Sequence, residues 1–197
     1  RGTTHISVID AEGNAAAATI TNGEGNGHMV KGCGFMLNNM LGEEDLNPDG
    51  FHLWEPGTRL STMMAPTIAL SPDGALTALG SGGSNRIRTA ILQVAVNLFD
   101  RKMSLDDAIN AARLHVERGS AVSFEDAPWE IVFNEVERAA LLETYPQAHG
   151  WPEQNLFFGG VHSARRDGSG RLEGAGDPRR EGCVVVDARV RCGRGGS

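Results

Sequence analysis

Apolar and polar residues alternate near the N-terminus in a way that predicts a β-hairpin. The segment 4–10 alternates, Ala11-Glu12-Gly13-Asn14 has turn composition, and 15–21 follows as an alanine-rich second strand. The small side chains of residues 15–18 favour a buried second strand, because another layer could approach them closely. A glycine-rich loop over 22–34 follows.

A second hairpin, a glycine loop and a helix are predicted in direct succession. The apolar segments 67–70 and 75–79 flank Ser71-Pro72-Asp73-Gly74, in which Pro and Gly stand where a turn needs them. After the glycine-rich segment 80–85, apolar residues recur at helical spacing. They are Ile87, Ala90, Ile91, Val94, Ala95 and Leu98.

Two more helices are predicted from their capping residues. Ser104 resembles an N-cap, and the helix after it is expected to run to about His115. Asn134 with Glu137 has the spacing of a capping box, and that helix should stop near Pro146. Beyond them, the tail is expected to form strands over 157–164 and 183–187, separated by glycine-rich loops that include 174–182.

Composition restricts the partners of the chain. Its 197 residues suit one domain, 1–197, and the net charge of -7 argues against a nucleic-acid partner. No apolar run reaches the roughly 20 residues that span a bilayer, so no membrane insertion by this chain is expected. Three cysteines without a C-x-x-C pair, and histidines without i, i+4 spacing, indicate neither a disulfide framework nor a metal site; no cofactor is predicted.

Thr3 carries the first candidate chemistry. An N-terminal threonine can attack with its hydroxyl while its own amine, of pKa about 7.7 to 8, takes the proton. The bond Gly2-Thr3 is a plausible scissile bond, since a residue without a side chain hinders attack least. On position alone, a threonine that merely begins a strand is the simpler interpretation.

Several blocks of the sequence, in order, resemble the small subunit of the gamma-glutamyltranspeptidase family. Any single block could match by chance, but the ordered set is specific. The blocks are residues 3–10 (TTHISVID), 37–39 (LNN) with the acidic stretch after them, 59–67 (RLSTMMAPT), 80–87 (GSGGSNRI), 110–115 (NAARLH) and 174–180 (GAGDPRR).

The resemblance implies an α+β fold, the small-subunit part of an N-terminal-nucleophile (Ntn) hydrolase with a four-layer αββα sandwich. A precursor would cleave itself before Thr3, and this chain would pair with the large subunit from the same precursor. Thr3 would be the nucleophile and Thr21 the hydroxyl that orients it. The family draws a substrate-binding arginine from the large subunit, so the isolated chain should be inactive.

Substrate recognition is also implied by the resemblance. A gamma-glutamyl group carries an amine, which needs an anion, and a carboxylate, which needs hydroxyl or cationic donors. Family positions assign the first role to Glu43, with Glu44 and Asp45 as alternatives, and the second to Ser61 and Thr62. The family has aspartate at position 43, a polar residue at Met40, serine at Thr62 and asparagine at Gly23, with Asn22 beside it.

The glycine-rich turn can stabilise the oxyanion of an amide attack, because backbone N–H groups converge there without side chains. Gly82 and Gly83 are the expected donors, and Ser84 is expected to bind substrate. The sequence Ser84-Asn85 leaves the register of the donors open by one residue. A phosphate loop is less consistent, since the Walker lysine is missing.

Three functions remain open. The first is a gamma-glutamyltransferase or glutathione hydrolase, with glutathione as the expected donor. The second keeps the fold and nucleophile but acts as an acylase on glutaryl-cephalosporins or on poly-gamma-glutamate, which the changes at Met40, Glu43 and Gly23 allow. The third is an unprocessed, non-catalytic homologue, because Arg1 and Gly2 deny Thr3 a free amine.

Two further residues and the compartment complete the expectations. His115 is expected to pack or satisfy a local hydrogen bond, and Cys33 is expected to be inert. Family members are often exported, which favours an extracytoplasmic location for the protein.

Overall fold

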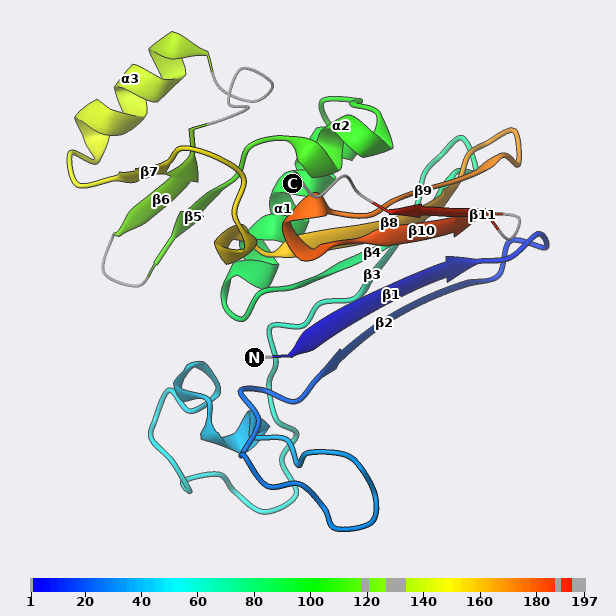
Figure 1. Ribbon diagram of the computed structural model, residues 1–197. Helices are drawn as coiled ribbons and strands as arrows, with labels where there is room; N and C mark the ends of the chain where they lie inside the picture. Colours follow the sequence, from blue (N-terminus) through cyan, green and yellow to red (C-terminus); the bar gives the residue numbers. More distant parts are fainter. Residues whose placement is uncertain (1, 118–120, 127–133, 187–188, 193–197) are drawn as a thin grey trace.

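Two β-sheets pack face to face, and helices cover the outer face of one of them (Figure 1). The computed structural model describes residues 2–117, 121–126, 134–186 and 189–192. One sheet is the hairpin of β1 (Thr3–Ile9) and β2 (Ala15–Thr21). The other is antiparallel throughout, in the order β3 (Thr67–Leu70), β4 (Leu76–Gly82), β8 (Gly160–Arg166) and β9 (Leu172–Ala175).

The two predicted hairpins are confirmed, and alternation determines which residues of β1 face inward. His5 is only 5% exposed, whereas its neighbour Ile6 on the other face is 50% exposed. The expectation of a buried β2 is wrong for this chain, because Ala16 and Ala18 are exposed on the same outward face. Ala15 and Ala17 on the other face are partly buried, so the small residues lie on both sides of the hairpin.

Helix α1 (Arg86–Phe99) supports the opposite face of the larger sheet. The predicted apolar stripe is confirmed, since Ile87, Ala90, Ile91, Val94 and Leu98 are buried. They pack against Leu79 of β4 and Val161 of β8, together with residues of α2 (Leu105–Asn110). The result is a single core that holds the glycine turn before α1 in a fixed place.

The second helix is shorter than predicted. Ser104 caps α2 as expected, by accepting a hydrogen bond from Asp107 N–H, but the helix ends at Asn110. The chain then becomes extended, so His115 lies in strand β5 (Leu114–Val116) rather than in a helix. The physical reason is Arg113, whose buried side chain and backbone N–H are both bound to acidic residues.

Arg113 belongs to a buried ionic network that joins distant segments. Its Nη2 donates to Asp177 Oδ2 at 2.6 Å, and Arg179 Nε donates to Glu125 Oε1 at 2.7 Å. Asp177 also accepts a hydrogen bond from Arg179 Nη1 at 3.2 Å, so the two pairs are continuous. Because these side chains are almost fully buried, each charge needs its partner. The network fixes the short 3₁₀-helix η5 (Pro178–Arg180) beside β8.

A smaller layer lies beyond α1. It holds β5, β6 (Val122–Glu125), β7 (His149–Trp151) and α3 (Glu135–Thr144). The capping box at Asn134 and the stop before Pro146 are confirmed. Strands β6 and β7 were not predicted; they pair in parallel and are short.

The C-terminal part of the chain differs from the prediction on both sides of strand β8. Residues 156–158 form the 3₁₀-helix η4 (Leu156–Phe158), and the loop predicted over 174–182 contains the end of β9 and η5. β10 (Cys183–Val186) pairs with β11 (Arg189–Cys192); Asp187, the predicted end of the last strand, lies outside the described residues. Cys183 is disulfide-bonded, which the odd number of cysteines did not indicate.

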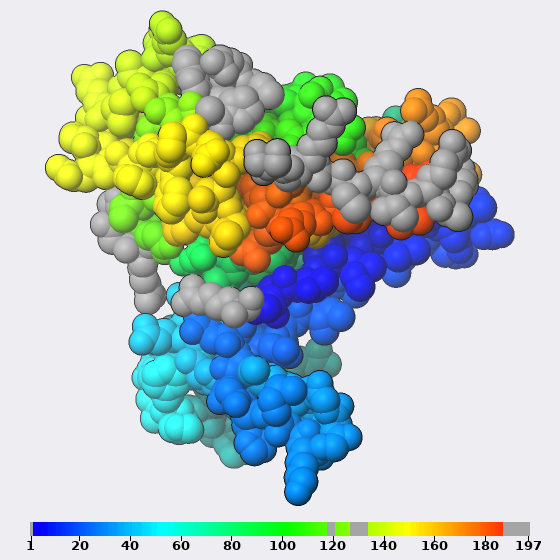
Figure 2. Space-filling model, in the orientation of Figure 1, coloured from blue at the N-terminus to red at the C-terminus, as the bar shows by residue number. Residues whose placement is uncertain are grey.

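Residues 22–66 form an extended group of loops below the sheets, containing the 3₁₀-helices η1 (Met40–Gly42) and η2 (Glu44–Leu46) (Figures 1 and 2). These loops join β2 to β3 and reach back to the N-terminal end of β1. In the part of the chain that the structure describes, no helix has both the length and the apolar character to cross a bilayer.

Candidate active site

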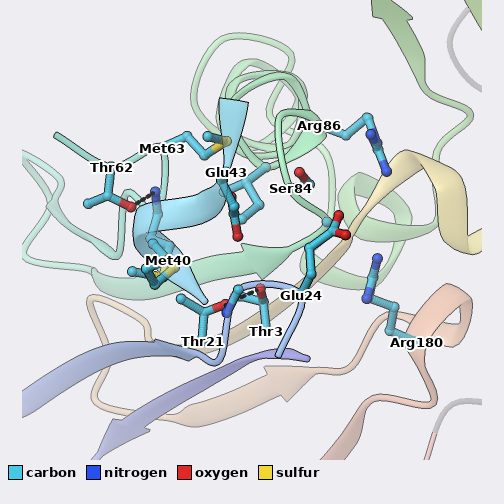
Figure 3. Close-up of a pocket in the computed structure, with 14 residues that line it drawn as sticks. Thr3, Thr21, Glu24, Met40, Glu43, Thr62, Met63, Ser84, Arg86 and Arg180 are labelled. Atoms are coloured by element: carbon cyan, nitrogen blue, oxygen red, sulfur yellow. Dashed lines mark hydrogen bonds between the residues drawn. The ribbon is translucent and has the colours of Figure 1, made fainter. Parts of the chain in front are cut away.

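A pocket opens where β1, β2, the loops over 22–66 and the start of α1 meet (Figure 3). It brings together most of the residues proposed from sequence. The lining residues are Thr3, Thr21, Gly23, Glu24, Met40, Glu43, Thr62, Met63, Met64, Gly83, Ser84, Arg86, Ile87 and Arg180.

Thr3 is held by the register of its hairpin. It lies opposite Thr21, and the two side-chain oxygens are hydrogen-bonded at 2.9 Å. Gly23 N–H donates to the same Thr21 oxygen at 2.9 Å, which fixes that hydroxyl beside Thr3. From the other sheet, Gly82 approaches so closely that a Cβ there would lie 2.7 Å from the Thr3 carbonyl oxygen. A hydroxyl so constrained would need little reorganisation before it reacted.

His5 packs below Thr3 in the space that Gly80 leaves between the sheets. A Cβ on Gly80 would lie 2.3 Å from the imidazole ring. The ring bonds the hydroxyls of Thr19 and Ser7, each at 2.8 Å. Burial, together with the charge of His162, lowers the pKa of His5 to about 4, so the ring is neutral near pH 7. His5 therefore supports Thr3 as a neutral, hydrogen-bonded side chain.

The part of the glycine-rich turn that lines the pocket begins at Gly83, one residue after Gly82, the first of the two expected donors. Gly82 is the last residue of β4 and is not among the lining residues, whereas Gly83 and Ser84 are. Gly83 has φ +139° and Ser84 has φ +55°, a conformation that favours glycine. Within the described residues, neither backbone N–H donates a hydrogen bond to another group of the chain. Both are therefore available to a ligand.

The acidic candidates are separated by the structure. Glu43 and Thr62 both line the pocket, and Glu43 Oε1 would lie 2.9 Å from a Cβ on Gly23. Glu44, Asp45 and Ser61 line a neighbouring pocket instead, which shares Thr62 and Met63 with the first. Of the three carboxylates considered, Glu43 alone lines the pocket of Thr3.

Five lining residues had no role from sequence: Glu24, Met63, Met64, Arg86 and Arg180. Arg86 and Arg180 belong to the blocks GSGGSNRI and GAGDPRR, so the sequence placed them near matched positions without assigning them a function. The feature that could have indicated a role is their positive charge: Arg86 follows the glycine turn, and Arg180 follows the buried acid Asp177. The two methionines follow Thr62 directly and give the pocket an apolar wall.

The remaining candidates lie away from Thr3. His115 is buried, bonds the Thr89 hydroxyl at 2.8 Å and borders the neighbouring pocket, in agreement with a local structural role. Cys33 is a free, exposed thiol in the loops. Among the described residues, no cluster of three or more His, Cys, Asp or Glu side chains could hold a metal ion. Arg1, which motivated the unprocessed alternative, is outside the described residues.

Comparison with known proteins relates this chain to enzymes that are described as proenzymes. The family model for gamma-glutamyltranspeptidase matches residues 1–186. The glutathione hydrolase proenzyme of Pseudomonas aeruginosa is 31% identical, over 93% of this chain and 34% of its own length. The acylase ACY 1 proenzyme of Pseudomonas sp. (strain SE83) is 34% identical, over 93% and 32%. The chain thus spans about a third of the length of these relatives.

The fold has a close solved counterpart. The crystal structure of the Bacillus anthracis transpeptidase CapD superposes with a TM-score of 0.71 at 30% identity. The match covers 93% of this chain and 99% of that chain. The likeness of fold therefore extends over most of the chain.

Proposed function

The chain belongs to the gamma-glutamyltranspeptidase family and has the small-subunit part of the N-terminal-nucleophile fold, and from this we propose that it is the catalytic small subunit of a gamma-glutamyl amide-cleaving enzyme with Thr3 as nucleophile. The partner would be the large subunit of the same precursor, released when the Gly2-Thr3 bond is cleaved. The donor is a small gamma-glutamyl compound such as glutathione. The observation that carries this proposal is the convergence of the Thr3–Thr21 hydroxyl pair and the Gly83-Ser84 turn on one pocket.

The proposed mechanism is a two-step acyl transfer. After processing, the free amine of Thr3 takes the proton from its own hydroxyl as Oγ1 attacks the gamma-carbonyl carbon. The C–N bond of the amide then breaks, the amine product leaves with the proton, and an ester on Thr3 remains. Water or an amino acid attacks that ester and releases Thr3, giving hydrolysis or transpeptidation respectively.

The oxyanion of each step is proposed to bind the backbone N–H groups of Gly83 and Ser84. This choice moves the donor pair one residue beyond Gly82 and Gly83, which is the single residue by which the sequence left the register open. It is supported by the position of Gly82 inside β4 and by the absence of intramolecular acceptors for the later two N–H groups among the described residues. Such preorganised donors contribute most where water is excluded.

Glu43 is proposed to bind the substrate amine, and Thr62 the substrate carboxylate. Two departures from the family pattern compensate each other here: glutamate is one methylene longer than aspartate, and glycine replaces asparagine at Gly23. A side chain at Gly23 would begin 2.9 Å from the Glu43 carboxylate, so the longer acid occupies space that the glycine vacates. Ser61 faces the neighbouring pocket and has a supporting rather than a direct role.

The test is turnover of a gamma-glutamyl anilide by the full protein. The proposal predicts activity in the wild type and its loss in Thr3→Ala. Thr4→Ala is the matched control, because the same hydroxyl is removed from the outward face of β1, away from the pocket. Equal activity in the Thr3→Ala and wild-type proteins would overturn the nucleophile assignment.

A glutaryl-specific acylase is the second candidate. It is favoured by Met40, an apolar residue in the pocket where the family has a polar one, and by the similarity to an acylase proenzyme. A glutaryl group lacks the amine that Glu43 would bind. Higher kcat/KM for a glutaryl anilide than for the gamma-glutamyl anilide would favour this function; a protein that stays unprocessed and inactive on both would be the non-catalytic homologue.

A further inference from the structure

The turn that carries the proposed oxyanion donors has a backbone conformation that residues with a side chain rarely adopt. Gly83 has φ +139° and Ser84 has φ +55°, shortly before the start of α1. Both residues line the pocket of Thr3 (Figure 3). A residue other than glycine keeps a left-handed conformation only where its surroundings hold it there. The contacts of the next residue, Asn85, supply part of that support.

Asn85 occupies the N-cap position of α1 but does not cap the helix. Asparagine at this position normally accepts a hydrogen bond from a backbone N–H of the first helical turn. Here its φ and ψ are the helical values -58° and -23°, and its side chain makes no such bond. Instead its Nδ2 donates to Glu117 Oε2 at 2.7 Å, and its Oδ1 accepts from Arg86 Nη1 at 2.5 Å. The side chain of Asn85 is thus directed across the helix start, toward the end of strand β5.

Glu117 is a fixed acceptor, because strand β5 is clamped to α1 just before it. The Gln93 side chain of α1 accepts a hydrogen bond from Leu114 N–H and donates one to the Leu114 carbonyl oxygen, each at 2.9 Å. The backbone N–H of Glu117 donates to the Ala121 carbonyl oxygen at 2.8 Å. Glu117 is therefore held beside the first turn of α1 by contacts that do not involve its own carboxylate.

The other oxygen of the Glu117 carboxylate faces a ring nitrogen that carries no proton. The Thr89 hydroxyl donates to the Arg86 carbonyl oxygen at 3.1 Å, so it accepts the 2.8 Å hydrogen bond from His115 Nδ1. Burial lowers the pKa of His115, so near pH 7 the neutral ring presents a lone pair at Nε2, 3.3 Å from Glu117 Oε1. This buried Nε2 has no hydrogen-bond partner within the described residues. The carboxylate is held instead by Asn85 and by the charge of Arg86, whose Nη1 lies 4.0 Å from Oε1.

We propose that Glu117 is a positioning residue: its hydrogen bond to Asn85 fixes the turn whose N–H groups bind the oxyanion. The inference rests on the proposed function, which assigns that role to Gly83 and Ser84. Glu117 borders the neighbouring pocket and does not line the pocket of Thr3. Its effect is therefore expected on the transition state, where charge develops on the carbonyl oxygen, rather than on binding of the acyl head.

The experiment measures kcat and KM for gamma-glutamyl-4-nitroanilide on the full, processed protein, together with the inhibition constants Ki of two probes. Glutamate, the product of hydrolysis, binds without forming a tetrahedral anion. An analogue of glutamate with a boronic acid in place of the gamma-carboxylic acid adds the Thr3 hydroxyl to boron and becomes a tetrahedral anion that resembles the transition state. A misfolded fraction lowers the apparent kcat but leaves Ki unchanged, so the probes separate positioning from loss of folded protein.

Glu117→Ala should lower kcat about tenfold and raise the Ki of the boronic acid by a similar factor. KM and the Ki of glutamate should stay within about twofold of wild type, because the acyl head binds elsewhere. Glu117→Gln should retain most of the activity, since its amide oxygen still accepts from Asn85 and its amide nitrogen donates to the His115 lone pair. Asn85→Ala should reproduce the loss, and the double variant should lose no more than either single variant.

Glu173→Ala is the matched control. The Glu173 side chain is 35% exposed, against 34% for Glu117, and it likewise pairs with an arginine, Arg165, at 3.4 Å. It lies on β9 and does not line the pocket of Thr3. Its removal should leave kcat and both Ki values at the wild-type level.

Other results overturn the inference in distinguishable ways. If wild type cleaves the anilide and Glu117→Ala does so at an unchanged rate, the positioning role fails and the proposed function stands. If Glu117→Ala raises both Ki values equally, the residue supports binding of the acyl head instead, and the inference fails. If Glu117→Gln loses as much activity as Glu117→Ala, the charge and not the hydrogen bond to Asn85 is responsible, and the inference also fails. If wild type cleaves no gamma-glutamyl donor, the proposed function fails and this inference fails with it.

Discussion

Replacing Gly80 with alanine should disturb the contact between the two sheets directly under Thr3, the proposed nucleophile. The new Cβ would lie 2.3, 2.3 and 2.8 Å from three atoms of the His5 ring, all far inside van der Waals distance. The ring is 5% exposed, and each nitrogen is held by a hydroxyl at 2.8 Å. It cannot move without losing those hydrogen bonds.

The cost combines overpacking with weakened hydrogen bonds and should be about 2 to 4 kcal/mol of unfolding free energy. Because Thr3 is two residues from His5 on the same face of β1, kcat should fall as well. Equilibrium urea unfolding of the full protein measures the first effect, and anilide turnover measures the second.

A double-mutant cycle tests the reasoning. In a His5→Ala background the added methyl group has room, so Gly80→Ala should then cost less than about 0.5 kcal/mol. Free-energy changes that add within about 0.5 kcal/mol across the cycle would refute the contact as the cause.

Three other changes follow from the same geometry. Thr21→Val should lower kcat with anilide donors by about 10- to 100-fold with little change in KM, while Thr21→Ser stays near wild type, because only the hydroxyl beside Thr3 matters; equal loss in both would contradict this. His5 binds its proton more weakly in the folded state, at a pKa of about 4, than at the ordinary 6.5, so folding stability is lost as pH falls between these values. His5→Gln should reduce the stability lost between pH 7 and pH 4.5 by about 2 kcal/mol, measured by urea unfolding, and an unchanged loss would exclude His5 as its source. Arg113→Met should destabilise by about 3 to 5 kcal/mol at pH 7 because it leaves Asp177 buried with fewer partners, and a change below about 1 kcal/mol in unfolding free energy would argue against the network.

Local sequence signals predicted the helices and strands that are determined by residues close together in the chain. Alternation in β1 and turn residues located the two hairpins, helical spacing located α1, and the Asn134 capping box located α3. Helix α2 ended early because the Arg113 side chain forms an ion pair with Asp177 and its backbone N–H donates to Glu125, and both partners lie outside the helix. Short strands such as β6 and β7 were missed because pairing across the fold, rather than their own composition, defines them.

The sequence identified many residues of the candidate site but did not predict how they are arranged in space. Thr3, Thr21, Glu43 and Thr62 line one pocket, as the resemblance led us to expect, although their roles remain proposals. Sequence could not place Ser61 in the neighbouring pocket, because adjacent residues of an extended segment point to different sides. Arg180 lacked a role for a similar reason: its position depends on a buried network and on glycines in another strand.

The most direct test of the central claim is the intact mass of the purified full protein and of its Thr3→Ala variant. The account predicts two subunits in the wild type, with the smaller one beginning at Thr3, and a single uncleaved chain in the variant. Cleavage that persists in Thr3→Ala, or a small subunit that begins at another residue, would contradict the assignment of Thr3 as the nucleophile.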